Sequence, residues 1–304
     1  MIEHRSDGTC ALYLRQPPAS LTELCVVLEV GLSALSAPSV QALLIVTESA
    51  VLTLDADQPW RQRWITERSE HVLHESMRWQ RTLRDLRAVG KPVVFVLQPT
   101  GQAVPRVCGL DAELALACTA RVVPRASQWG LSHLPQGLLP FGGACAALVR
   151  RALTPHMLSD EADPLAYLQP LFVTLIKGEC LEAPEAQRWG WLSASDLLLP
   201  PNKVAFALTL AARLGLLIAE SGAFTENPAS PLYAAGQRAR AVLTLWLHVQ
   251  RWGAHLDDAA WHRAQRLAHV LCGGDLALPQ WVSEDYLLAL EREAFAAAWR
   301  ELSS

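Results

Sequence analysis

Glu113 and His133 are the residues whose types and spacing best suit proton-transfer chemistry. Glu113 lies early in the apolar segment Leu110–Cys118, where a carboxylate is costly unless it is paired or faces a cavity. His133 follows twenty residues later, before a glycine-rich turn that ends at Gly143. An acid and an imidazole on adjacent elements could share a proton-transfer task. From these residues alone a structural role stays equally open, because Glu113 could cap or pair and His133 could be a hydrogen-bonded core residue.

Other chemistries have weaker support. His71 and His74 lie three residues apart on one predicted helix face, but no third metal ligand is evident nearby, so an amphipathic surface is favoured over a metal site. Ser132 next to His133 lacks the sequence of a nucleophile elbow. The sequence contains neither a phosphate-binding loop nor a glycine fingerprint after its first strands. It therefore predicts no metal, no dinucleotide and no other cofactor.

Composition limits the partners and the compartment. Lys and Arg number 26 and Asp and Glu number 30, a net charge of −4, so a nucleic-acid backbone is not expected as a partner, although a few local cations could hold a CoA-type anion. The seven cysteines include no Cys-x-x-Cys pair and lie mostly among apolar residues, which is typical of a reducing compartment. The longest uncharged stretch, residues 30–47, is interrupted by Ser, Pro and Gln. With no apolar leader at residues 1–5, we expect a soluble cytoplasmic protein without a membrane span.

The elements that must position Glu113 and His133 alternate between strands and helices. Residues 42–47 and 93–97 are short continuous apolar runs, the pattern of strands buried on both faces. Residues 9–15 also indicate a strand, and Ser20 can cap the helix that follows it. Helices are further predicted at about 60–89 and 110–119, and a strand at 121–123. The order predicts an α/β core with parallel pairing.

The predicted class changes near residue 200. Strand signals stop beyond about Pro201, and alanine-rich helices dominate to Ser304. The prediction is a core over residues 1–200 followed by a helical C-terminal region over residues 201–304.

Five segments in order, with compatible spacing, resemble the crotonase (enoyl-CoA hydratase/isomerase) superfamily over about residues 9–200. They are Ala42–Thr47 leading to Ala56-Asp57, Lys91–Val94, Gly109–Cys118, Gly130–His133 and Gly137–Gly143. Residues 183–192 with Ser195-Asp196 resemble the family's A-x-E-A-x-x-x-G turn. Residues 267–275 and 282–295 resemble the tail of the hydratase half of bacterial multifunctional proteins, in which a 3-hydroxyacyl-CoA dehydrogenase half precedes it. That dehydrogenase half is not seen here, in agreement with the absent dinucleotide fingerprint.

The resemblance implies a fold, a substrate and a set of site residues. The fold would be a crotonase-type spiral of β-β-α turns, assembled as a homo-oligomer, a trimer or a dimer of trimers. The backbone N–H groups of Ala56 and Leu110 would form an oxyanion hole for the enolate of an acyl-CoA thioester. Glu113 and His133 would face each other across one cavity as the acid-base pair. CoA would be part of the substrate, in fatty acid metabolism, and no separate cofactor is implied.

Four departures from the family pattern bear on activity. The helix of the active hydratases opens with three glycines, where this chain has Gly109-Leu110-Asp111. The family's second catalytic glutamate falls on His133. Residues 98–106 form an apparent insertion, and the family's Gly-Ala-Asp turn reads Asp55-Ala56-Asp57.

Three functional interpretations follow. The first is an active enoyl-CoA hydratase/isomerase, because an imidazole can replace a carboxyl in proton transfer. The second is a catalytically degraded homologue that binds acyl-CoA or a partner subunit without turnover, which Leu110 and Asp111 at the glycine positions favour. The third is an acyl-CoA thioester hydrolase with His133 as the base. The sequence leaves all three open.

Overall fold

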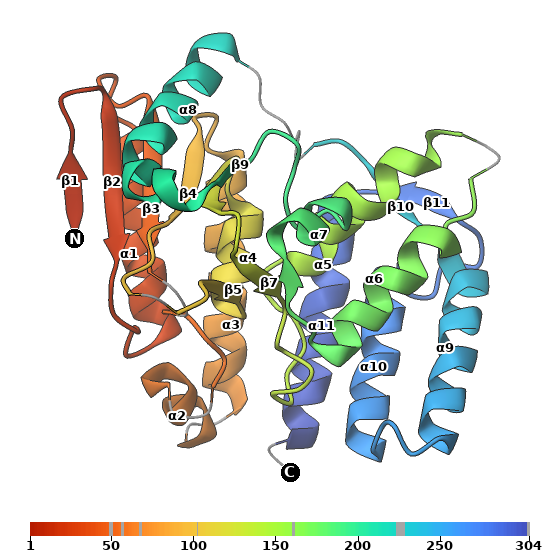
Figure 1. Ribbon diagram of the computed structural model, residues 1–304. Helices are drawn as coiled ribbons and strands as arrows, with labels where there is room; N and C mark the ends of the chain where they lie inside the picture. Colours follow the sequence, from red (N-terminus) through yellow and green to blue (C-terminus); the bar gives the residue numbers. More distant parts are fainter. Residues whose placement is uncertain are drawn as a thin grey trace. The chain divides into compact units, whose positions relative to one another are not determined.

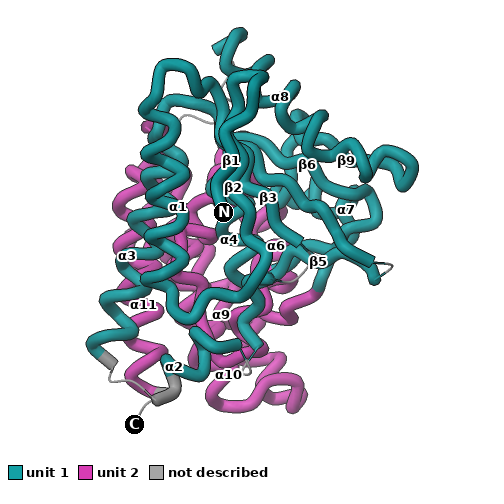
Figure 2. Tube along the Cα trace, turned by 90° about the vertical axis from the view of Figure 1, so that its left-hand side faces the viewer, with its two compact units in different colours: residues 1–130, 180–228 teal, residues 131–179, 229–304 magenta. Residues whose placement is uncertain are grey.

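In the computed structural model the described residues are 1–48, 51–55, 58–66, 69–101, 103–159, 162–222 and 229–302. They divide into two compact units, each made of two separate stretches of sequence. Unit 1 comprises residues 1–130 and 180–228, and unit 2 comprises residues 131–179 and 229–304 (Figure 2).

Unit 1 is built on a six-stranded sheet in the order β1-β2-β3-β4-β6-β9. The strands are β1 (Ile2–His4), β2 (Thr9–Leu14), β3 (Ala42–Thr47), β4 (Val93–Leu97), β6 (Ala120–Pro124) and β9 (Leu197–Leu199). All neighbouring pairs are parallel except β1 with β2. Every residue of β3 and β4 is buried, which confirms the prediction of strands covered on both faces.

A second, three-stranded sheet accompanies the main one. Strand β7 (Gln128–Gly130) pairs in parallel with β5 (Arg106–Cys108) and antiparallel with β8 (Leu181–Glu182). Along the chain, β4 of the main sheet leads to β5 of the second sheet and then to helix α4 (Leu110–Ala117), and β6 likewise leads to β7. Successive strands thus alternate between two sheets, which is the predicted β-β-α turn.

Helix α1 (Leu21–Leu35) packs on one face of the main sheet. Ser20 caps it as predicted, because its hydroxyl accepts a hydrogen bond from the N–H of Glu23 at 3.1 Å. Gly31 allows the close approach, since a Cβ there would lie 3.1 Å from a methyl carbon of Leu12 and 3.2 Å from one of Leu43. A larger residue at position 31 would therefore push the helix off the sheet.

Helix α8 (Ala207–Ser221) covers the opposite face of the main sheet (Figure 1). Ala207 and Ala211 pack into a buried cluster with Leu44 and Val94, and a Cβ at Gly215 would lie 2.8 Å from the Cβ of Ala42. Together with the short helix η3 (Pro201–Phe206), it forms the one described helical segment long and apolar enough to cross a membrane. In unit 1 the small residues of this segment are used to pack against strands.

The remaining helices of unit 1 are α2 (Pro59–Thr66), α3 (Ser69–Ala88) and α7 (Ala183–Arg188). A fully buried ion pair ties β6 to the segment before β9. The guanidinium of Arg121 donates to both carboxylate oxygens of Asp196 at 3.2 and 3.1 Å and also to the carbonyls of Ala115 and Cys118. Every hydrogen-bonding nitrogen of this arginine therefore has an acceptor.

Unit 2 is mostly helical. Its helices are α5 (Ala144–Leu148), η1 (Val149–Leu153), η2 (Thr154–Leu158), α6 (Leu165–Lys177), α9 (Gly236–Trp252), α10 (Asp258–Leu271) and α11 (Glu284–Leu302). The buried carboxylate of Glu291 on α11 accepts from the backbone N–H groups of Gly143 and Cys145 and so caps α5.

The structure differs from the prediction in two respects. The region after residue 200 is not entirely helical, because β10 (Leu232–Ala234) pairs antiparallel with β11 (Gln280–Val282). The compact units also divide the chain differently from a boundary at residue 200. Helix α8 packs on the sheet of unit 1, whereas α5 and α6 contact α10 and α11 in unit 2. The composition therefore changes at residue 200, although helix α8, which follows it, still packs on the sheet of unit 1.

The buried ion pair gives a stability prediction. Asp196→Asn leaves the buried charge of Arg121 without its counter-charge, so we expect the free energy of unfolding to fall by about 3–5 kcal/mol. The matched control is Glu29→Gln in the exposed pair with Arg78, also in unit 1, with an expected loss of about 0–1 kcal/mol. Urea denaturation followed by circular dichroism measures both. Equal losses in the two variants would contradict the structural role of Arg121–Asp196.

Candidate active site

Helix α4 positions Glu113, and a tight approach of backbone segments sets where the helix begins. Gly109, immediately before it, has φ 64° and ψ −127°, and a Cβ there would lie 2.8 Å from the Cγ of Leu54. Only glycine combines this backbone conformation with this space. The segment of residues 51–54, which follows β3, can therefore lie directly against the start of α4.

Leu52 joins this segment to the helix through two hydrogen bonds, one that its carbonyl accepts and one that its N–H donates. The Leu110 N–H donates to the Leu52 carbonyl at 3.1 Å, and the Leu52 N–H donates to Oδ2 of Asp111 at 2.9 Å. The hydroxyl of Thr47, at the end of β3, lies 3.5 Å from Oδ1 of Asp111. Leu110 is the first helical residue, so its N–H has no acceptor within the helix. The carbonyl of Leu52 supplies one.

This arrangement bears directly on the predicted oxyanion hole. Of its two predicted donors, Ala56 lies outside the described residues, and the Leu110 N–H is hydrogen-bonded to Leu52. A substrate oxygen would have to replace the Leu52 carbonyl to use that donor. The role of both residues as oxyanion donors stays a prediction.

Asp111 is a second buried carboxyl at the start of α4. Burial raises its pKa to about 7, although hydrogen bonds from the N–H groups of Leu52 and Val51 and from the hydroxyl of Thr47 oppose the rise. Sequence reasoning treated Asp111 only as a substitution at a glycine position. The argument applied to Glu113, that a carboxylate in an apolar helix needs a reason, would also have singled out Asp111.

Glu113 is buried, with 1% of its surface exposed, and its Oε2 accepts a 2.7 Å hydrogen bond from the indole N–H of Trp79 on α3. Sequence analysis did not identify this partner. A second pair of the same kind lies in unit 1, where the indole N–H of Trp64 donates to Glu75 at 2.6 Å. Glu75 also accepts from the backbone N–H and the hydroxyl of Thr22. The neutral indole of Trp79 holds the Glu113 carboxylate in place without contributing a positive charge.

His133 belongs to unit 2 and is fully buried. Its ring lies edge-on to Phe141, with centroids 5.8 Å apart, and Phe141 in turn contacts Phe295 of α11 at 4.7 Å. Glu113 belongs to unit 1, and the pairing of the two residues across one cavity stays a prediction.

Two adjoining cavities of unit 1 lie at the carboxyl ends of its parallel strands. One, of about 380 Å³, is lined by residues at the ends of β2, β3 and β4, including Thr47. The other, of about 390 Å³, extends from Met1 to Leu52. Tyr13 and Arg15 line both, and the Arg15 guanidinium lies 4.9 Å from the centroid of the Tyr13 ring. The second cavity reaches Leu52, and the first reaches Thr47, whose hydroxyl lies 3.5 Å from Oδ1 of Asp111.

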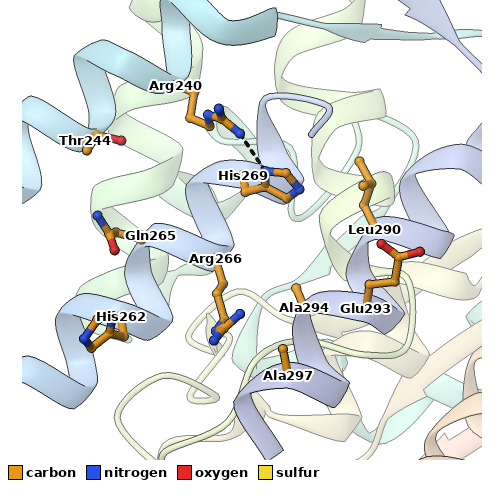
Figure 3. Close-up of a pocket in the computed structure, with 10 residues that line it drawn as sticks. All are labelled: Arg240, Thr244, His262, Gln265, Arg266, His269, Leu290, Glu293, Ala294 and Ala297. Atoms are coloured by element: carbon orange, nitrogen blue, oxygen red, sulfur yellow. Dashed lines mark hydrogen bonds between the residues drawn. The ribbon is translucent and has the colours of Figure 1, made fainter. Parts of the chain in front are cut away.

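A larger cavity of about 560 Å³ lies in unit 2 among α9, α10 and α11 (Figure 3). Arg240 crosses its wall, donating to Nδ1 of His269 and to Oδ1 of Asp275, each at 2.7 Å. Burial lowers the pKa of His269, and a ring that accepts at Nδ1 is neutral, with its proton on Nε2. None of the predicted site residues lines this cavity. Across the described ranges of the chain, no group of three or more His, Cys, Asp or Glu side chains is arranged to hold a metal ion.

The raised pKa of Asp111 predicts how stability depends on pH. Between about pH 4 and pH 7 the folded protein keeps a proton that the unfolded chain releases, so stability falls as the pH rises and then levels off. Asp111→Asn removes this dependence. As the pH rises from 5 to 8, we expect the unfolding free energy of the variant to gain about 2.5 kcal/mol relative to that of wild type, measured in urea. A pH-independent difference between the two proteins would show that Asp111 titrates normally.

Comparison with known proteins places the fold. No family model matches the chain. A curated relative from Bacillus subtilis (strain 168), named "Probable 3-hydroxyacyl-CoA dehydrogenase", is 25% identical over 228 residues, which are 75% of this chain and 27% of that protein. The chain thus spans about a quarter of the length of this relative.

Solved structures are similar over most of the chain. A "putative enoyl-CoA hydratase" from Streptomyces coelicolor A3(2) matches with a TM-score of 0.56 and 24% identity, covering 73% of this chain and 76% of that one. The enoyl-CoA hydratase from Bacillus anthracis matches with a TM-score of 0.52 and 15% identity, covering 88% of each chain. These similarities confirm the fold predicted from the sequence. The chain has the crotonase-type fold of the enoyl-CoA hydratase/isomerase structures.

Proposed function

We propose that this protein binds an acyl-CoA thioester and acts on it as an enoyl-CoA hydratase or isomerase, with Glu113 as a proton-transfer group. The observation that carries the proposal is the buried Glu113 carboxylate, held by the neutral indole of Trp79 in the first turn of α4. Asp196, which is bound to a guanidinium, has the partner expected of a structural charge. Glu113 lies where the resemblance expects a proton-transfer carboxylate, and the hydrogen bond from Trp79 orients it.

The cavities of unit 1 support an acyl-CoA ligand. They lie at the carboxyl ends of parallel strands, where α/β sheets commonly bind ligands. The cation of Arg15 lines both cavities and suits the phosphates of CoA, and Leu52 forms part of the wall of one of them. A thioester that entered beside Leu52 would approach the Leu110 N–H, which now donates to the Leu52 carbonyl.

The proposed chemistry follows the resemblance. The thioester oxygen would accept from the N–H groups of Ala56 and Leu110 as an enolate develops, with the Leu52 carbonyl displaced from Leu110. Glu113 would act as the base and His133 as the acid, because an imidazolium donates a proton near neutral pH. The reaction would be hydration or isomerisation at the carbons next to the thioester.

A second candidate is binding of an acyl-CoA or a partner subunit without turnover. The Leu110–Leu52 hydrogen bond favours it, because the donor that would stabilise the enolate is engaged by the protein itself. Leu110 and Asp111 also replace two glycines of the family pattern. A site whose oxyanion donor is bound by its own backbone can keep a ligand cavity and still lose the group that stabilises an enolate.

The proposal includes a cytoplasmic location and a homo-oligomer, a trimer or a dimer of trimers. Exposed apolar side chains on α9 suit an assembly contact, among them Leu245 with 63% and Trp252 with 83% of their surfaces accessible. Burying such groups between subunits removes apolar surface from water.

The direct test incubates the purified protein with enoyl-CoA esters of several chain lengths and resolves the products by mass spectrometry. Hydrated or isomerised product supports the proposed activity, and hydrolysed product supports a thioesterase. Unchanged ester that binds in calorimetry supports the second candidate. Absence of both turnover and binding would refute an acyl-CoA function.

Trp79 and Glu113 are expected to control turnover together. Glu113→Gln and His133→Ala should each lower kcat by about 10²-fold or more, the range for losing a positioned acid or base. Trp79→Phe removes the indole donor and should also lower kcat and shift its pH profile. The matched control is Trp64→Phe, which removes the same type of indole–carboxylate bond at Glu75. Equal kcat losses in the two tryptophan variants would show that the hydrogen bond from Trp79 to Glu113 has no specific effect on turnover.

The Leu110 N–H can be removed without breaking α4, because proline is tolerated at the first helical position. Leu110→Pro and Leu110→Ala both lose the leucine side chain, but only the proline variant loses the donor. If the N–H stabilises the enolate, kcat of the proline variant should be about 10²–10³-fold below that of the alanine variant. Similar kcat values would show that this N–H serves only to bind Leu52.

A further inference from the structure

Two cysteines far apart in sequence meet at the second sheet of unit 1. The Sγ atoms of Cys108, at the end of β5, and Cys180, just before β8, lie 3.3 Å apart. Cys108 is buried, whereas Cys180 is exposed. One thiol of the pair is therefore open to a reagent in solution, and the other is shielded behind it.

The register of the sheet explains why the sulfurs can meet. Cys108 of β5 pairs with Gly130 of the central strand β7. On the other side of β7, Leu181 of β8 pairs with Trp129, so the preceding residue, Cys180, comes opposite Gly130. Residues paired in register point to the same face of a sheet. Because glycine has no side chain, the two cysteine side chains can reach each other across β7.

The electrostatic surroundings favour a thiolate at Cys180. A hydrogen bond from the Cys108 thiol and the positive charge of Arg106 lower the pKa of Cys180 to about 6, against an opposing effect of burial. The same hydrogen bond, burial and the nearby charge of Asp111 raise the pKa of Cys108. Cys180 is thus the nucleophile of the pair, and Cys108 keeps its proton.

Other cysteines lack these properties. Cys10, Cys25, Cys118, Cys145 and Cys272 are all buried. Burial raises the pKa of Cys25 to about 11 and that of Cys272 to about 12. Since the thiolate is the reactive form, these residues provide an unreactive background within the same chain.

We propose that Cys108 and Cys180 form a redox-active dithiol that a hydroperoxide converts to an intramolecular disulfide. The Cys180 thiolate attacks one peroxide oxygen, the O–O bond breaks, and the sulfur becomes a sulfenic acid as hydroxide leaves and is protonated to water. The Cys108 sulfur then attacks the Cys180 sulfur, the S–O bond breaks, and hydroxide leaves as water with the Cys108 proton. In sum, two thiols and one hydrogen peroxide give one disulfide and two waters.

Closing the bond requires a local movement. A disulfide joins Cα atoms no more than about 6.8 Å apart, which is less than two strand spacings of about 4.8 Å. Cys180 lies just outside β8, so its segment can move toward Cys108 without breaking the β7–β8 ladder. Residue 108 directly precedes Gly109, and the disulfide would therefore hold the segment that leads into α4. In a reducing compartment such a bond is transient, as expected of a redox sensor.

The test treats the reduced protein with hydrogen peroxide and follows intact mass and cysteine peptides by mass spectrometry. We expect a loss of two hydrogens, a Cys108–Cys180 cross-linked peptide, and reversal by dithiothreitol. Cys180 should react with iodoacetamide at neutral pH at least about 10-fold faster than the five buried cysteines outside the pair. This readout does not depend on turnover, so it can fail or succeed independently of the proposed function.

Three variants sharpen the test. Cys108→Ala should stop at a sulfenic acid on Cys180, trapped by dimedone, and should slow its first oxidation. Gly130→Ala keeps both thiols but places a methyl group between them, and should suppress the disulfide. Cys118→Ala, a buried thiol elsewhere in unit 1, should leave disulfide formation unchanged. The proposal is overturned if wild type gives only a sulfenic acid or an intermolecular dimer, or if Cys180 reacts no faster than the buried cysteines.

Discussion

The backbone N–H and C=O groups of one residue, Leu52, connect the segment after β3 to the start of α4, where Glu113 lies. The described residues 51–54, which follow β3, form no strand, and their buried N–H and C=O groups still require hydrogen bonds. The start of α4 meets both needs, through the Asp111 carboxylate and the otherwise unsatisfied N–H of Leu110. Asp111 supplies an acceptor for the Leu52 N–H that a glycine at this position would lack. The carbonyl of Leu52 in turn accepts from the Leu110 N–H, the donor that the proposed catalysis would use.

Three buried carboxylates of unit 1, those of Asp196, Asp111 and Glu113, accept hydrogen bonds from different kinds of donor. Asp196 is neutralised by Arg121 and fixes β6 to the segment before β9. Asp111 is held by backbone and hydroxyl groups, and its raised pKa reflects the lack of a compensating charge among those donors. Glu113 is held by the indole of Trp79. An opposite charge compensates the burial of Asp196, whereas burial without one raises the pKa of Asp111.

Parallel pairing brings the ends of β2, β3 and β4 to one edge of the main sheet, where the two cavities of unit 1 lie. The second sheet ends close to the same helix, since Cys108 is followed directly by Gly109 and α4. Leu52, which lines one of these cavities, is hydrogen-bonded to Leu110 and Asp111, and Cys108 lies two residues before Leu110.

The sequence by itself determined the class of fold and the elements around Glu113. Continuous apolar runs at residues 42–47 and 93–97 have the pattern of strands buried on both faces, and the capping residue Ser20 marks the start of α1. These are local signals, since hydrophobicity and capping act within a few residues. Only the tertiary structure decided that Trp79 donates to Glu113, that Leu52 engages Leu110 and that Cys108 meets Cys180, because each contact joins residues at least 34 positions apart. It also assigned α8 to the sheet of unit 1, since composition describes what a segment can bury but not the surface against which it packs.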